Sequence, residues 1–363
     1  MSRAREFADL AGSADAGGIT GKNMVVNGSM AVAQRSTQVT GIATAGYKTL
    51  DRYKLQLNSA GRLTMEQVAD VHDGFANALK ISCTTADTSI AADEYFFIQQ
   101  ELEGQDLQQI EKGTSSAKEV TVSFYVKGNA AATYTVELED RDNNRYNSIE
   151  FPVTTSWTRV TKTFTADTTG TLDDDANGSL RVNFWFHGGS SYTGGTHTDN
   201  SWHTTSNQRV GDNQTSFFDS TSRTFFLTGL QLELGDKATP FQHEDAGTTL
   251  RKCQRYYYRT VSTSSNNFLG YAMAANTTNM YLPITFPTTM RSNPSSIDVT
   301  AGSSGNIGYW LGGAVTAFTS VSIAESGTGM TTLNCAVGSG LSAEKMYGVL
   351  PNGSGSIGFN SEL

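Results

Sequence analysis

The chain has 363 residues, more than one ordinary hydrophobic core holds, so we expect two domains with connecting segments. A charged fraction of 17% and an aromatic fraction of 10% exclude an intrinsically disordered protein, which would be richer in charge and poorer in aromatic residues. The net charge of −9 argues against a nucleic-acid partner, and no apolar run approaches the roughly 20 residues of a membrane helix, so we expect no membrane insertion.

The N-terminus and the cysteines indicate where the chain is made. The first residues lack the apolar segment of a secretory signal. Cys83, Cys253 and Cys335 are odd in number and far apart, which gives neither a disulfide framework nor a zinc-binding spacing. The sequence therefore fits synthesis in a reducing cytoplasm.

Residues 1–21 are predicted to form a separate unit. SRAREFADL can form one or two helical turns, with Phe7 and Leu10 on one side and Arg3 and Arg5 beside them. So short a helix is marginal alone, and the GSADAGGITG that follows is typical of a flexible connector. We expect this segment to become ordered only by docking on another protein.

Residues 22–245 have the pattern of an antiparallel β-sandwich. Asn27 and Gly28 lie between two apolar runs, which indicates a hairpin or a tight turn. Alternating strand patterns then recur at the spacing of a sandwich. Two predicted strands have clear apolar faces, one with Val120, Val122, Phe124 and Val126, and the other with Leu180, Val182, Phe184 and Phe186. We expect these two faces to pack together.

The end of this domain has its own pattern. FFLTGLQLELGDKATPFQH alternates as a strand until Gly235, with Gln231 and Glu233 where a water-facing side would place them. A helix is then predicted over 246–260, capped by Thr248 or Thr249.

Tyr256, Tyr257 and Tyr258 belong to this predicted helix. On a helix they point in three directions and cannot all enter one core, so we assign them to a subunit or domain interface.

Residues 261–363 are rich in Gly, Ser, Thr and Asn and contain short β patterns, which predicts a second, smaller all-β domain. The fold class is thus all-β, with a sandwich, a short helix and a second β domain. Tyr309 and Trp310 follow a Gly- and Ser-rich loop, and adjacent residues of a strand face opposite sides. One of these rings should be exposed.

Several motifs occur in an order that resembles a known family. NGSM, LDRYKL, FYVKG, TTSWTRVTKTFTA, LRVNFWF, NSW, TGLQLELG and CQRYYYR together resemble tailed-phage tail-fibre and virion proteins with a galactose-binding-type, carbohydrate-binding-module-like jelly roll. The resemblance covers about residues 22–259. In such modules the closing strand returns beside the first one.

The resemblance implies a non-enzymatic protein of the virion, often a homotrimer, made in the host cytoplasm. It implies attachment to other tail or virion proteins through the N-terminus and binding to host cell-surface glycans through the distal part. The alternatives are a head fibre or decoration protein and, less favoured, a polysaccharide-degrading tail spike.

Glycoside hydrolysis needs a pair of carboxyl groups close to the sugar. Glu137 and Glu139 share one face of a strand, which we expect to be wet, while Asp173, Asp174 and Asp175 lie in a turn. Nucleophile-elbow, phosphate-loop and zinc-protease motifs are absent from the sequence. We therefore expect no enzymatic activity.

Metal binding has two candidate regions. Asp140, Asp142 and Asn144 alternate in a turn and could hold a structural calcium ion, which modules of the resembled type often carry; a solvated turn is favoured over it. His187, His197 and His203 lie in one loop, but their separations match no known ligand spacing. No cofactor is expected beyond that calcium.

Four aromatic residues are candidates for sugar stacking: Tyr192, Trp202, Tyr309 and Trp310. Tyr192 and Trp202 belong to residues 188–216, the longest stretch without periodicity. For Trp202 we favour a structural role, with the ring packed over the edge of the sandwich. For Tyr309 and Trp310 the alternative is that both rings are packed, one in the core and one against another subunit.

Overall fold

The computed structural model describes residues 23–260, 267–299, 307–351 and 355–363. The chain divides into two compact units, Met1–Thr249 together with Leu363, and Leu250–Glu362. We call residues 23–249 the sandwich domain and residues 250–362 the C-terminal domain. The residues predicted to anchor the chain, Arg3, Arg5, Phe7 and Leu10, lie outside the described residues.

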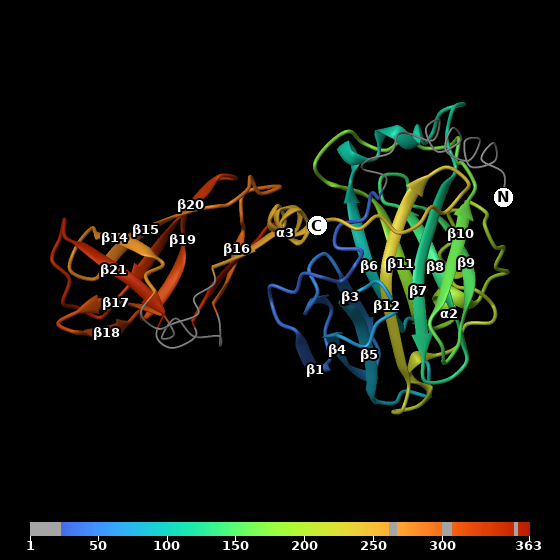
Figure 1. The fold of residues 1–363 in the computed structure, drawn as a ribbon, viewed down its shortest axis with the longest axis horizontal. Coiled ribbons are helices and arrows are strands. Elements are labelled where there is room, and N and C mark those ends of the chain that lie inside the picture. The colour runs from blue at the N-terminus through green and yellow to red at the C-terminus, as the bar shows by residue number, and fades with distance from the viewer. Residues whose placement is uncertain (1–22, 261–266, 300–306, 352–354) are drawn as a thin grey trace. The chain divides into compact units, whose positions relative to one another are not determined.

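The sandwich domain consists of two six-stranded antiparallel sheets (Figure 1). The first sheet contains, in spatial order, β1 (Gln38–Ile42), β4 (Arg62–Val68), β5 (Ala78–Thr85), β12 (Thr224–Leu234), β7 (Val120–Gly128) and β10 (Thr158–Phe164). The second contains β2 (Gly46–Tyr47), β3 (Lys54–Asn58), β6 (Tyr95–Glu103), β11 (Gly178–Gly188), β8 (Ala132–Asp140) and β9 (Arg145–Val153). Short helical segments are η1 (Gly104–Asp106), η2 (Gln108–Ile110), α2 (Ser190–Thr193), η3 (Ser206–Gln208) and η4 (Phe217–Asp219).

The core lies between these two sheets, as the alternation predicted. The apolar face of β7 and the apolar face of β11 both belong to it, and the rings of Phe124 and Phe184 meet edge to face with their centroids 5.0 Å apart. The prediction of an all-β sandwich is confirmed. The predicted tight turn is also confirmed, with Asn27 at a φ of 61° and a hydrogen bond from the Met30 N–H to its carbonyl.

The closing strand β12 lies inside its sheet, between β5 and β7. Gly229, at a φ of +62°, forms a bulge, and beyond it the Met24 N–H donates to the Leu232 carbonyl at 3.0 Å. The segment before the first strand thus runs beside the closing strand, but the first strand itself does not: β1 pairs with β4, two strands away from β12, so the expectation that the closing strand lies beside the first one is wrong.

The expectation of a water-facing side at Gln231 and Glu233 is wrong. Both side chains are buried, because the chain turns back over them. The Gln242 N–H donates to Gln231 Oε1 at 2.8 Å, and the Thr239 N–H donates to Glu233 Oε2 at 3.0 Å.

The helix predicted over 246–260 is shorter than expected. α3 spans Ala246–Gln254, and Asp245 caps it, accepting from the Thr248 N–H at 2.9 Å, where the sequence had suggested Thr248 or Thr249. The chain then forms β13 (Tyr257–Arg259), paired with β22 (Ile357–Asn360).

The placement of the three tyrosines on a helix is therefore wrong, whereas their assignment to a subunit or domain interface stays a prediction. Tyr256 and Tyr257 are buried within the chain, and Tyr258 packs against the core of the C-terminal domain, stacked 6.1 Å from the ring of Phe359. Tyr257 and Tyr258 belong to a strand that pairs with a segment about 100 residues away, and Tyr256 lies in the turn before it.

The C-terminal domain contains two antiparallel sheets. A three-stranded sheet has the order β13, β22 and β16 (Ser296–Val299). A seven-stranded sheet has the order β18 (Ala314–Ala317), β17 (Ile307–Leu311), β21 (Met346–Pro351), β14 (Gly270–Ala274), β15 (Asn279–Thr285), β20 (Met330–Ala336) and β19 (Ser320–Ser326). The sequence did not indicate β21, which pairs with both β14 and β17.

Candidate functional site

A row of polar side chains lies on the outer side of the second sheet of the sandwich. The alternation along β11 turns Arg181 and Asn183 outward, while their neighbours fill the core. The register places acidic or amide side chains of β6 and β8 opposite both of them. We call this set the polar face: Gln99, Glu101, Glu137, Glu139, Arg181 and Asn183.

Arg209 organises the polar face. Its Nε donates to Glu137 Oε1 at 2.8 Å, and its terminal NH2 donates to Glu137 Oε2 at 2.8 Å and to Glu139 Oε2 at 3.0 Å. The guanidinium lies 4.1 Å from the ring centre of Tyr146 and 5.1 Å from that of Trp185. A fork of two hydrogen bonds combined with ring stacking is a contact that arginine makes and lysine does not.

The two carboxylates held by Arg209 are buried, so the expectation that Glu137 and Glu139 are wet is wrong. They do share one face of β8, as predicted, but residues 188–216 cover that face. Burial by itself raises the pKa of Glu139, but the guanidinium groups of Arg209 and Arg181 outweigh it and hold that pKa below its ordinary value. Glu139 is therefore ionised at neutral pH and belongs to a buried ion network.

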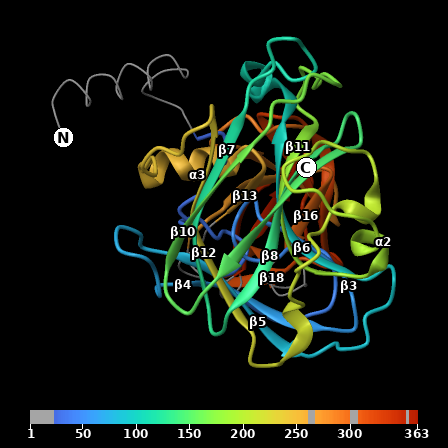
Figure 2. The ribbon, with the colours of Figure 1, turned by 90° about the vertical axis from the view of Figure 1, so that its right-hand side faces the viewer.

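Residues 188–216, which we call the cover loop, are fixed to the sheet by several contacts. His203 forms a β-bridge with Tyr146, and the Gln214 side chain donates to the Trp185 carbonyl at 2.8 Å. Trp185 and Val210 form a small apolar cluster against which Tyr192 packs. Figure 2 shows α2 of this loop on the outer side of the sheet that contains β6 and β11.

The predicted sugar-stacking residues of the cover loop both have packing contacts. Tyr192 is half-buried, with its ring centre 5.2 Å from that of Trp185. Trp202 packs against the main core, its Nε1 donates to the Thr165 carbonyl at 2.7 Å, and the Lys112 ammonium lies 5.1 Å from its ring centre. The structural role favoured for Trp202 fits this geometry.

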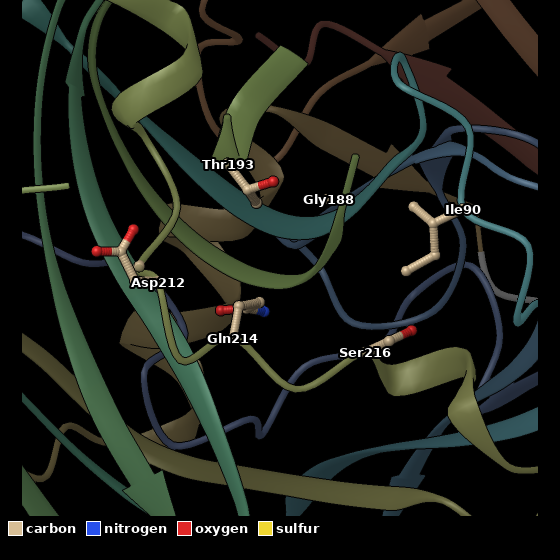
Figure 3. Close-up of a pocket in the computed structure, with 7 residues that line it drawn as sticks. Ile90, Gly188, Thr193, Asp212, Gln214 and Ser216 are labelled. Atoms are coloured by element: carbon tan, nitrogen blue, oxygen red, sulfur yellow. The ribbon is translucent and has the colours of Figure 1, made fainter. Parts of the chain in front are cut away.

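A pocket of about 250 Å³ opens between the cover loop and the loop that precedes β6. Its lining is mostly polar: Ile90, Gly188, Thr193, Gly211, Asp212, Gln214 and Ser216. In Figure 3, Ile90 lies opposite Thr193 and Gln214 across the opening. A hollow of this size, with hydroxyl, amide and carboxylate groups, suits one sugar unit better than an extended chain.

Two atoms of the polar face lie buried with no hydrogen-bond partner among the described residues. They are Asn183 Oδ1 and Arg181 Nε. Buried polar atoms are nearly always satisfied, so each can bond to a water molecule or to a hydroxyl of a ligand. The polar face therefore retains hydrogen-bonding capacity beyond its own network.

The calcium candidates do not form an open carboxylate cage. Asp140 is fully buried and pairs with the Lys112 ammonium, which also lies 3.0 Å from Asp167 Oδ2. Asp142 Oδ2 accepts from the Asp173 N–H at 2.9 Å, and Asn144 occupies the turn with a φ of 51°. The expectation of a solvated turn is thus wrong for Asp140, because a buried lysine already supplies its counter-charge.

The three histidines of the cover-loop region lie in different surroundings. His197 Nε2 is 3.0 Å from Ser148 Oγ, and His203 Nδ1 accepts from the Thr205 N–H. His187 lies instead with Asp87 and Glu94 at the ends of other strands. Sequence reasoning missed that grouping because the three residues form no local motif.

The remaining predicted pair, Tyr309 and Trp310, faces opposite sides of β17. Tyr309 is buried in the core of the C-terminal domain, whereas Trp310 is 44% exposed. Trp310 is accompanied by other exposed apolar side chains on the outer side of the same seven-stranded sheet. We call this set the apolar face: Phe268, Tyr271, Met273, Tyr281, Trp310, Met330 and Met346.

None of the helices in the described residues has the length and hydropathy needed to span a bilayer.

Comparison with protein families shows a match of residues 83–208 to the model of a carbohydrate-binding domain, CBM4/9. This range contains β6, β7, β8, β9, β10 and β11 and most of the cover loop. The sandwich of this chain thus contains a carbohydrate-binding jelly roll of that type. A comparison with curated proteins found no match.

Solved structures similar to the chain include a CBM4 structure, with 13% identity, 50% of this chain and 86% of that chain covered, and a TM-score of 0.26. A family 11 carbohydrate-binding module from Clostridium thermocellum, in complex with a mixed-linked tetrasaccharide, has 13% identity, covers 55% and 100%, and has a TM-score of 0.30. The enzymatically active domain of tailspike protein 4 of bacteriophage CBA120 has 11% identity, covers 58% and 21%, and has a TM-score of 0.31. At these scores the likenesses add nothing to the functional argument, which rests on the family model.

Proposed function

We propose that this protein is a non-enzymatic structural protein of a phage virion, a tail fibre that binds glycans of the host surface. The observation that carries the proposal is the match of residues 83–208 to a carbohydrate-binding domain. The virion role comes from the ordered motifs of the sequence, and with it the attachment of residues 1–21 to another tail or virion protein. A head fibre or decoration protein of similar build is the alternative.

Within the sandwich, the pocket beside the cover loop is the proposed place of glycan binding. It lies within and just after the matched range, and its lining includes hydroxyl, amide and carboxylate side chains, the kinds of group that contact sugar hydroxyls. Asp212 is exposed at this pocket, and Ile90, 45% exposed, offers an apolar surface to a sugar ring. The distal placement of glycan binding, at Trp310, stays a second prediction.

The proposal of a non-enzymatic protein is supported by the state of the carboxylates singled out in the sequence. Glu137 and Glu139 are both held by Arg209, and Asp140 is held by Lys112. A glycoside hydrolase needs one carboxyl group that gives up a proton and another that meets the sugar. Carboxylates locked in buried ion pairs serve neither purpose, which disfavours the depolymerase alternative.

The proposal includes self-association into a homotrimer, with a second copy of this chain as the partner of the apolar face. The five strands β17, β21, β14, β15 and β20 contain no charged residue. Exposed Tyr, Phe and Met side chains on a surface without charge suit a subunit interface. The apolar face supports self-association, and the number three comes from the family resemblance.

The glycan proposal is tested on the full chain with an array of bacterial surface oligosaccharides, followed by calorimetric titration of the best binder. Ile90→Trp should fill the mouth of the pocket and weaken binding at least ten-fold, because the sugar unit loses its place. Asp212→Ala should weaken binding less, through loss of one acceptor. Asp174→Ala, an exposed carboxylate in a distant turn, is the matched control and should bind as the wild type does.

Three outcomes would contradict this proposal. Wild-type affinity in Ile90→Trp would exclude the pocket as the binding place. Absence of binding to every oligosaccharide would remove the glycan-binding function itself. Release of new reducing ends from a bound polysaccharide would identify the protein as a depolymerase.

A further inference from the structure

Three side chains that can ligate a metal meet at one edge of the sandwich. Asp87 follows β5, Glu94 immediately precedes β6, and His187 lies near the end of β11. One ligand atom from each residue lies within 4.8 Å of the other two. Asp87 and His187 are buried and Glu94 is half-buried, so the group is largely shielded from water.

The surroundings of the cluster hold each ligand in place. His187 Nδ1 is 2.8 Å from Ser216 Oγ, which leaves Nε2 directed at Glu94 Oε2, 3.4 Å away. Asp87 Oδ2 accepts from Ser59 Oγ at 2.7 Å and from the Ala60 N–H at 2.9 Å. A hydrogen bond on the far nitrogen of a histidine and on a ligating carboxylate is the support that metal ligands usually have.

The cluster carries negative charge without a basic partner. In the described part of the chain, neither Asp87 nor Glu94 forms an ion pair with lysine or arginine.

We propose that Asp87, Glu94 and His187 bind a divalent transition-metal ion, Zn²⁺ in the first instance, through one carboxylate oxygen of each acid and Nε2 of the histidine. Tetrahedral zinc with bonds of about 2.1 Å places its ligand atoms about 3.4 Å apart. The Nε2 to Oε2 separation of 3.4 Å has this value and is long for a good hydrogen bond. An imidazole among the ligands favours zinc over calcium, which prefers oxygen alone.

The ion would join two segments that are distant in sequence, and a third is linked to them by the hydrogen bond between Ser216 and His187. Asp87 and Glu94 lie at the two ends of the loop between β5 and β6, His187 belongs to β11, and Ser216 begins the turn of η4. Ser216, which is hydrogen-bonded to His187, and Ile90, which lies in the loop between Asp87 and Glu94, also line the pocket beside the cover loop. The metal would therefore stabilise the wall of that pocket, independently of whether a glycan binds there.

The experiment uses the full chain, stripped with EDTA and dialysed into chelator-treated buffer, and titrates it with zinc sulfate. Calorimetry should show one zinc ion per chain, and the midpoint of thermal unfolding should rise by about 5 °C at 100-fold excess over Kd. Glu94→Gln should abolish both effects. This variant keeps an oxygen to accept the 3.1 Å hydrogen bond from the Ala91 N–H, so it should fold normally.

His197→Gln is the matched control, because His197 lies 3.6 Å from Asp199 in the cover loop and is the other histidine–carboxylate pair of that region. It should bind one zinc ion as the wild type does. Cobalt in place of zinc should give the intense visible absorption of tetrahedral coordination, and Glu94→Gln should not. Equal zinc binding by wild type and Glu94→Gln, or no effect of zinc on wild-type unfolding, would overturn the proposal.

Discussion

The sandwich domain and the C-terminal domain each have a sheet with a core side and an outer side, and the two outer sides have opposite compositions. The polar face carries three acidic side chains and Arg181, yet Glu137 and Glu139 are buried beneath the cover loop. The apolar face is built on five strands without charge, yet Tyr271 is 59% exposed and Met346 is 60% exposed. On the outer side of the sandwich sheet the acidic side chains of the polar face are buried, whereas on the outer side of the C-terminal sheet the apolar side chains are exposed.

The two outer sides differ in whether their own chain covers them. The polar face is completed by its own chain, because Arg209 supplies the counter-charge and the cover loop excludes water. The apolar face has no such cover among the described residues, although a Phe268 ring partly fills the space above Gly348. A Cβ added at Gly348 would lie 2.1 Å from Phe268 Cε1, so the ring can keep this position only beside a glycine. We infer that the partner of the apolar face comes from another chain.

The largest effect should come from a charged side chain placed on the apolar face. Met273 and Met346 stand opposite each other on β14 and β21. The wild type should have a mass near three times 39.0 kDa by light scattering. Met273→Glu should have the mass of one chain, because a carboxylate cannot be buried in a subunit interface without a group of opposite charge or a hydrogen-bond donor. Ser296→Glu, at an exposed position of the three-stranded sheet, should remain trimeric. A wild-type monomer at micromolar concentration would remove the interface altogether.

The second largest effect should come from removing the centre of the polar face. Arg209→Leu leaves Glu137 and Glu139 buried without their main counter-charge, so the free energy of unfolding should fall by about 3–5 kcal/mol. Denaturant titration of the sandwich measures this loss. Lys118→Ala breaks an ion pair with Glu111 in which both side chains are more than 40% exposed, and should cost less than about 1 kcal/mol. Equal losses in the two variants would show that the cover loop does not bury the network.

Sequence alternation predicted correctly which side chains face the core, but it did not predict what surrounds the side chains on the outer side of the sandwich sheet. The apolar positions of β7 and β11 followed from alternation alone, because any strand with Val120, Val122 and Phe124 on one side must bury that side. Alternation also placed Glu137 and Glu139 together. Alternation cannot show which residues cover these two carboxylates. Arg209, which binds both, lies 70 residues after Glu139 in the chain.

The same limit explains the other errors. The tyrosines after α3 have a helix-compatible local sequence, but Tyr257 pairs with Asn360, and no local pattern reports such a partner. The residues of the proposed metal site stand at positions 87, 94 and 187, where strand ends bring them together without a spacing that could be recognised. In both examples the structure depends on contacts between residues that lie far apart in the sequence.

The smallest expected effect concerns Trp310, which lies near one end of the apolar face. β17 is the second strand of its sheet, and the register of Tyr309 with Val349 places Trp310 beside Gly348 and its covering Phe268 ring. The ring is 44% exposed, so it is available either to another subunit or to a sugar. Its position toward one edge of the sheet favours the sugar, because the exposed methionines nearest to it in the strand order, Met346 and Met273, lie on strands further in.

A fibre that carries Trp310→Ala should therefore stay trimeric and fully incorporated, and should bind host cells less well. Stacking of one ring on a sugar contributes about 1 kcal/mol, which is about a five-fold loss of affinity per chain, and three sites acting together increase the loss. Trp310→Phe keeps a flat ring and should recover most of the adsorption. Dissociation of Trp310→Ala into monomers would assign the ring to the subunit interface instead. Trimeric particles with unchanged adsorption, combined with loss in Ile90→Trp, would place glycan recognition in the sandwich alone.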